Sequence, residues 1–206
     1  YNHTTRDHWK LVTDSSLQGN NTFELVSPIL AGENGLKELE TVCWVLDICN
    51  AKVNDSCGFH VHMDAASFNL DTWKNLALTY KHLEHLIDAF MPRARRNNTY
   101  CKSLSGVSDE RIKAVRTIDD LQEVFNNDRY HKVNFEAYSR HRTVEFRQHS
   151  GTTNFTKMEN WIRFLNGLIT FAKSSSLPSR MTLEGLPFLN GKQKLFFKLR
   201  TKKLAV

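Results

Sequence analysis

The chain has 206 residues, of which 40% are hydrophobic and 24% charged, with 9 Gly and 4 Pro. This composition excludes a disordered chain, a collagen and a repeat array. The net charge of +6 comes from 28 basic and 22 acidic residues. Residues 192–203 contain six basic residues and no acidic residue, so the rest of the chain is neutral. We therefore expect no general polyanion partner.

The first third of the chain predicts a hairpin, a helix and a strand. Short β-type runs at 9–14 and 22–27 flank a Ser/Gly/Asn turn, which is typical of a hairpin. Apolar residues recur at helical spacing over 36–49. Residues 51–64 then alternate, which predicts a strand with apolar residues on one face and His60 and His62 on the other.

The remaining elements interleave helices and strands. In order they are a helix capped by Asp71 that runs to Phe90, a basic loop over 93–106, a weak helix over 109–127, strands over 132–138 and 143–149 joined by a basic turn, and a helix over 156–172. Few crossovers have βαβ regularity, so we expect an α+β fold with a curved, mostly antiparallel sheet flanked by helices. Without an internal repeat or a linker, 1–206 is predicted as a single domain, with a core over about 9–172 and a basic tail over about 173–206.

Cysteine usage and hydropathy bear on where the protein works. Four cysteines are present without a CxxC pair or a regular framework spacing, which favours reduced thiols in a cytoplasmic protein over disulfides or zinc. No apolar run approaches the roughly 20 residues of a membrane helix, so no membrane partner is expected.

Two predicted strands carry chemistry-bearing side chains on alternate positions. His60 and His62 project to one side of their strand, where two imidazoles form half of a site for a divalent metal. Glu145 and Arg147 likewise share a face, and this pair suits a metal ligand beside a fork for phosphate or carboxylate. The alternative for each pair is a solvated polar face of a sheet.

Two further signals are weaker when taken alone. Glu24 lies inside an apolar strand, where a carboxylate is costly unless it is paired, bound to metal or on a solvent-facing edge. Arg93, Arg95 and Arg96 occupy three of four positions in a loop and could clamp phosphates, although a solvated charge run has the same composition. Together the acidic, imidazole and guanidinium groups suit phosphoryl transfer onto a carboxylate, and no glycine-rich nucleotide motif accompanies them.

From about Trp9 to Trp161 the sequence resembles the phage and bacterial amidoligase family, distant relatives of glutamine synthetase and glutamate–cysteine ligase. The motifs that carry the resemblance are Trp9-Lys10 through Asp14-Ser15-Ser16, Glu24-Leu25-Val26-Ser27-Pro28, Gly58-Phe59-His60-Val61-His62, Arg95-Arg96-Asn97, Lys132-Val133-Asn134-Phe135 and Thr143-Val144-Glu145-Phe146-Arg147-Gln148-His149-Ser150-Gly151-Thr152. The combination is specific, whereas each motif alone is not. The resemblance implies a glutamine-synthetase-like catalytic domain over 1–206.

The resemblance also implies an activity and its cofactors. The expected reaction is ATP- and Mg²⁺-dependent (or Mn²⁺-dependent) joining of a small-molecule or peptide carboxylate to an amine through an acyl-phosphate. The implied roles are metal ligation by Glu24, His60 and Glu145, nucleotide binding by His62, Arg93 and Arg147, and contact with phosphate or the substrate carboxylate by Arg95, Arg96 and Arg147. The family pattern opens with a strand that carries two alternate glutamates, and no segment before Trp9 matches it, so we expect that strand to be missing.

Two other functions remain open from the residues alone. A metallohydrolase would use His60, His62 and a carboxylate to hold Zn²⁺ and activate water. A nucleic-acid-binding module would use the arginine loop and the basic tail, although we do not expect a nucleic-acid partner.

Overall fold

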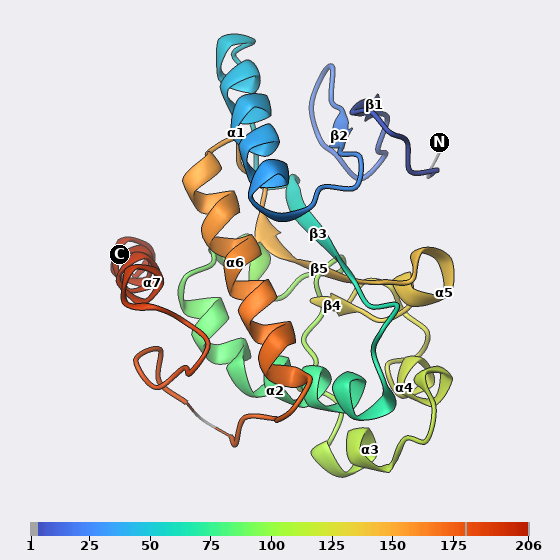
Figure 1. The fold of residues 1–206 in the computed structure, drawn as a ribbon. Coiled ribbons are helices and arrows are strands. Elements are labelled where there is room, and N and C mark those ends of the chain that lie inside the picture. The colour runs from blue at the N-terminus through green and yellow to red at the C-terminus, as the bar shows by residue number, and fades with distance from the viewer. Residues whose placement is uncertain (1–3, 180, 206) are drawn as a thin grey trace. The chain divides into compact units, whose positions relative to one another are not determined.

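The computed structural model describes residues 4–179 and 181–205. Figure 1 shows the elements, which are β1 (Lys10–Val12), β2 (Glu24–Val26), α1 (Gly32–Ile48), β3 (Gly58–Asp64), α2 (Leu70–Ala89), the 3-10 helix η1 (Arg93–Arg95), α3 (Asp109–Ala114), α4 (Ile118–Val124), β4 (Val133–Asn134), α5 (Ala137–His141), β5 (Thr143–Ser150), α6 (Phe155–Ala172) and α7 (Gly191–Leu204). Contacts divide the chain into two compact units. Unit 1 comprises Tyr1–Gly58 and Gly151–Glu159, and unit 2 comprises Phe59–Ser150 and Asn160–Val206.

Unit 1 contains the predicted hairpin and the first helix. Strands β1 and β2 pair antiparallel with Lys10 opposite Val26, which confirms the hairpin. Helix α1 begins at Gly32, before the predicted start at residue 36. Its buried side includes Cys43, whose Sγ lies 3.5 Å from Met158 Sδ at the start of α6.

Unit 2 is built on a three-stranded sheet in the order β3-β5-β4. Strands β4 and β5 pair antiparallel, with Val133 opposite Phe146. Strand β4 has two residues and α5 follows it, so the predicted strand over 132–138 is wrong beyond Asn134. The reason is local: the Asn134 side chain accepts a hydrogen bond of 2.9 Å from the Glu136 N–H, an Asx turn that bends the backbone out of the strand.

Helix α2 supplies much of the core beneath this sheet (Figure 1). Leu76, Leu83 and Ile87 of α2 are fully buried with Phe146 of β5. The predicted cap at Asp71 is wrong, because the Asn69 side chain accepts the Thr72 N–H at 2.8 Å and begins the helix earlier.

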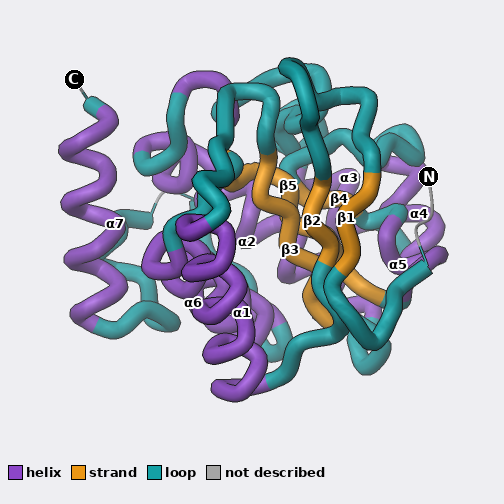
Figure 2. Tube along the Cα trace, turned by 90° about the horizontal axis from the view of Figure 1, so that it is seen from above, coloured by secondary structure: helices purple, strands orange, loops and turns teal. Residues whose placement is uncertain are grey.

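Two other segments of unit 2 differ in detail from their predictions. Residues 109–127 form two short helices, α3 and α4, because Thr117 begins a second helix with its own capping box. The basic tail contains helix α7, which packs beside α2 and α6 (Figure 2). Its Phe197 is 2% exposed, with its ring centroid 4.5 Å from that of Phe90.

The architecture mixes seven α-helices with small antiparallel sheets over the described residues, which confirms the α+β prediction. All four cysteines are free thiols. Within the described part of the chain, no helix is long and apolar enough to cross a membrane.

Candidate functional site

The predicted chemical residues of unit 2 gather around β5, the central strand of its sheet. Every residue of β5 from 144 to 149 is buried, so both of its faces are covered. Val144 and Phe146 point into the apolar core, and strand alternation sends Glu145 and Arg147 to the opposite face. The structure therefore places this carboxylate and this guanidinium in a protected polar layer.

Four side chains surround the Glu145 carboxylate, which is 6% exposed. Its Oε1 lies 2.7 Å from Arg147 NH1, 3.3 Å from His60 Nδ1 and 3.8 Å from His62 Nε2. Its Oε2 accepts a hydrogen bond of 2.6 Å from Asn134 Nδ2. The two motifs that lie more than 80 positions apart in the sequence thus meet at one carboxylate.

The surroundings of Glu145 decide its charge. Burial raises the pKa of the Glu145 carboxyl, but the hydrogen bond from His60 and the charge of Arg147 outweigh burial and hold the pKa well below its usual range. Burial lowers the pKa of the His62 imidazole, and Glu145 opposes this only in part. The site therefore pairs an ionised carboxylate with an imidazole that tends to be neutral near physiological pH.

Arg147 is fixed by three groups. Besides its ion pair with Glu145, its Nε donates to the Tyr100 carbonyl oxygen at 3.3 Å. The guanidinium carbon also lies 5.5 Å from the centroid of the Tyr130 ring. A guanidinium has five N–H donors, and the hydrogen bonds to Glu145 and Tyr100 use two of them, so Arg147 can donate further bonds to an anion.

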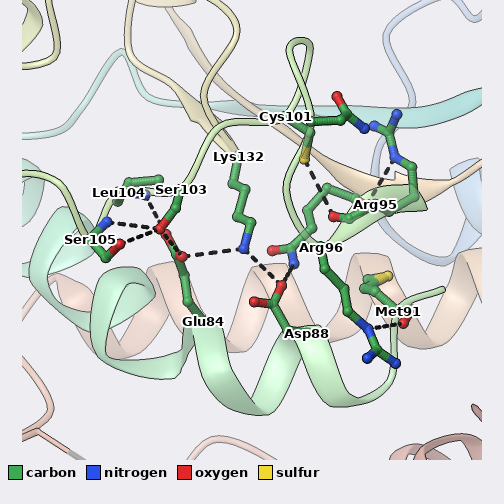
Figure 3. Close-up of polar contacts among 12 residues, drawn as sticks. Glu84, Asp88, Met91, Arg95, Arg96, Cys101, Ser103, Leu104, Ser105 and Lys132 are labelled. Atoms are coloured by element: carbon green, nitrogen blue, oxygen red, sulfur yellow. Dashed lines mark hydrogen bonds and ion pairs between the residues drawn. The ribbon is translucent and has the colours of Figure 1, made fainter. Parts of the chain in front are cut away.

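The three arginines of the 93–96 segment have different surroundings. Arg93 is exposed at the start of η1. Arg95 is 4% exposed, and its guanidinium donates to backbone carbonyl oxygens of β5. Arg96 is half-buried, and its Nε donates to the Met91 carbonyl oxygen at 3.0 Å (Figure 3). The sequence could not separate the three, because all of them stand in one short polar run.

Glu24 lies in β2, opposite Val12, and belongs to unit 1. The structure therefore brings together His60, His62, Glu145 and Arg147 within unit 2, and Glu24 stays a predicted ligand. Its half-buried position on a two-stranded sheet is also what the edge-strand alternative requires.

Several contacts of the site went unpredicted. Asn134 holds Glu145, and Thr143 Oγ1 lies 2.8 Å from His62 Nδ1. The sequence did offer one indication for Asn134: its predicted strand is joined by a short turn to the predicted strand that contains Glu145. The Tyr100 and Tyr130 contacts come from loops, whose course does not follow from residue spacing.

The donor types at Glu145 can be compared with what Mg²⁺ needs. A carboxylate is the ligand type that Mg²⁺ and Mn²⁺ prefer, whereas imidazole is softer. Over residues 4–179 and 181–205, no group of three or more His, Cys, Asp or Glu side chains is arranged to hold a metal ion. However, Mg²⁺ in nucleotide-using enzymes is held by one or two carboxylates together with phosphates and water, and Glu145 meets that smaller requirement.

A groove of about 730 Å³ lies elsewhere in unit 2, between α2, residues 181–184 and α7. It is lined by His85, Phe90, Lys198 and their neighbours, and none of the predicted site residues is among them. The polar layer around Glu145 is therefore the better candidate, because it alone combines the two strand motifs.

Comparison with known proteins agrees with the sequence motifs. No curated protein and no solved structure matches the chain. A family model described as "Putative amidoligase enzyme" matches residues 1–169, which include both strand motifs and the arginine segment. The chain belongs to the amidoligase family.

Proposed function

We propose that this chain is an ATP-dependent ligase that joins a small-molecule or peptide carboxylate to an amine, with Mg²⁺ or Mn²⁺ as its metal. Membership of the amidoligase family supports a ligase in general. The observation that carries the proposal further is the convergence of His60, His62 and Arg147 on one oxygen of Glu145. A cytoplasmic location, where ATP is available and thiols stay reduced, goes with this proposal.

The reaction in this proposal has two steps. A carboxylate oxygen of the substrate attacks the γ-phosphorus of ATP, so ADP leaves and the carboxylate becomes an acyl-phosphate. The amine nitrogen then attacks the acyl carbon, the C–O bond to phosphate breaks, and the nitrogen loses a proton as the amide forms. Bound Mg²⁺ would neutralise charge on the phosphates during the first step.

The side chains of unit 2 have distinct parts in this scheme. Glu145 is ionised, so it can bind the cation, with His60 beside it and Glu24 as a further proposed ligand. Arg147 would place its remaining N–H donors on the transferred phosphoryl group. Arg93, Arg96 and His62 are proposed contacts of the nucleotide and of the substrate carboxylate. Catalysis would come mainly from positioning and charge stabilisation.

A direct test measures ADP release after ATP, Mg²⁺ and panels of carboxylates and amines are mixed with the protein. We expect His60→Ala and Glu145→Gln to reduce ADP release by at least about 100-fold, because each removes a group at the charge-stabilising centre. Matched controls are His85→Ala and Glu123→Gln, which change exposed residues of the same types. Unchanged release in both site variants would show that this site does not support the reaction. No contact among the described residues favours a metallohydrolase or a nucleic-acid-binding module.

A further inference from the structure

The buried guanidinium of Arg95 reaches the backbone of β5 at the point where β4 stops pairing with it. Strand β4 pairs with β5 only at Glu145 and Phe146. Just beyond, the Arg147 N–H still donates to the Lys132 carbonyl oxygen at 2.9 Å. The Arg147 carbonyl oxygen lies past this paired stretch, and there Arg95 NH2 donates to it. The Arg95 side chain thus provides the hydrogen bond that a neighbouring strand would otherwise donate to this carbonyl oxygen.

Three more contacts connect the same stretch of backbone. Arg95 Nε lies 3.4 Å from the Gln148 carbonyl oxygen. The Cys101 thiol is 3.7 Å from the Arg95 carbonyl oxygen and 3.9 Å from that of Arg147, as Figure 3 shows for the Arg95 contact. Burial raises the pKa of Cys101 to about 11, so the group is a neutral thiol whose one S–H can donate weakly to either carbonyl.

A second buried polar layer, on the α2 side, supports β5 from the face opposite to Glu145. The Gln148 side chain donates to Asp88 Oδ1 at 2.5 Å and accepts from the Tyr80 hydroxyl at 2.7 Å. Lys132 points toward α2 between Glu84 and Asp88 in Figure 3, with Nζ–O distances of 3.2 and 2.7 Å. Residues 147 and 148 of β5 are therefore held by their backbone and by a side chain at once.

Arg95 is 4% exposed, and these contacts hold its guanidinium on the backbone of β5 rather than on an anion. Turning its guanidinium outward would leave the buried carbonyl oxygens of Arg147 and Gln148 without this donor, which is costly. Arg93, by contrast, is exposed, and the described contact of Arg96 uses only its Nε.

We propose that Arg95 is a positioning residue that fixes the backbone of Arg147, so that the Arg147 side chain stays on Glu145, and that Arg93 and Arg96 provide the anion contacts of this loop. The inference rests on the proposed ligase function for its kinetic consequences. Its structural part, the restraint of β5, holds independently of any activity.

The first experiment measures hydrogen–deuterium exchange of the full chain, using Arg95→Met and the exposed control Arg111→Met. We expect exchange of backbone amides over 143–150 to accelerate about tenfold or more in Arg95→Met, with α2 changed far less. Arg95→Lys keeps the charge but loses the planar fork, so it should accelerate the same segment to an intermediate degree. If exchange over 143–150 rises no more than that of α2 in both Arg95 variants, the proposal is overturned.

The second experiment separates positioning from nucleotide contact. In Arg95→Met we expect kcat to fall about tenfold while KM for ATP stays within about a factor of two. In an Arg147→Ala background, Arg95→Met should lower kcat little further, because its effect passes through Arg147. A raised KM for ATP with unchanged kcat, or fully additive losses, would overturn the proposal. If the unaltered chain releases no ADP with any substrate pair, the ligase proposal fails, and the exchange measurement still decides the role of Arg95.

Discussion

Replacing Lys132 by Met tests the buried polar layer beneath β5. The Lys132 side chain is 1% exposed, and its ammonium lies 2.7 Å from Asp88 and 3.2 Å from Glu84. Removing one partner of a buried ion pair costs about 3–5 kcal/mol of unfolding free energy, because the remaining charge is left uncompensated.

The other contacts of Glu84 and Asp88 decide where in the range of about 3–5 kcal/mol the loss of unfolding free energy should fall. The Glu84 carboxylate keeps two other donors, the Ser103 hydroxyl and the Leu104 N–H, each at 2.5 Å. The Asp88 side chain keeps the amide of Gln148 and is 29% exposed, so water can reach it. We therefore expect a loss near the lower end, about 3 kcal/mol.

Urea unfolding followed by circular dichroism measures the effect, with Lys113→Met on the exposed side of α3 as the control. Adding Asp88→Asn to Lys132→Met removes one orphaned charge and keeps an acceptor for Gln148. The loss of unfolding free energy in the double variant should therefore be smaller than the sum of the two single losses, by at least about 1 kcal/mol. A loss below about 1 kcal/mol in Lys132→Met, or strict additivity, would refute the reasoning.

Three further predictions concern single residues. Phe197→Ala should lower the unfolding free energy by about 3–5 kcal/mol, and Leu199→Ala by less than about 0.5 kcal/mol, because the first side chain is 2% and the second 56% exposed; urea titration compares them. Cys101, fully buried and with a pKa of about 11, should resist iodoacetamide at pH 8 while exposed Cys49 reacts, and mass spectrometry of the native protein would reveal early Cys101 labelling if this is wrong. Gly151→Ala should destabilise the end of β5, because its Cβ would overlap the Cys57 Cβ; an unchanged melting temperature would contradict this.

Because strand alternation is a local property, it predicted that His60 and His62 share one face of their strand and that Glu145 and Arg147 share one face of theirs. A period of two fixes which side chains share a face as soon as one face is apolar. Val61 is 9% exposed, and Val144 and Phe146 are fully buried, so the apolar faces are those that the pattern indicates. That the two strands are neighbours could not be read from alternation, and it is the sheet order β3-β5-β4 that shows it.

Lys132 shows what local patterns could not reveal. Residue spacing predicted only that Lys132 begins a strand, and a lysine normally reaches solvent. Its burial depends on Glu84 and Asp88, which lie 48 and 44 positions away and stand on a helix where charged residues normally face water. Such long-range pairing is set by tertiary packing, for which a single sequence carries no periodic signal.

Strand β5 explains why the core and the candidate site should respond together to mutation. Its outward residues Glu145 and Arg147 hold the charges of the site, and its inward residue Gln148 joins the polar layer on α2. Because adjacent residues of a strand share one backbone, a shift at Gln148 is passed directly to Arg147. Changes at Asp88 or Lys132 are therefore expected to lower the catalytic rate, although neither residue contacts the substrate in this proposal. The loss of rate should increase with the mobility of β5 and not with the charge that is removed.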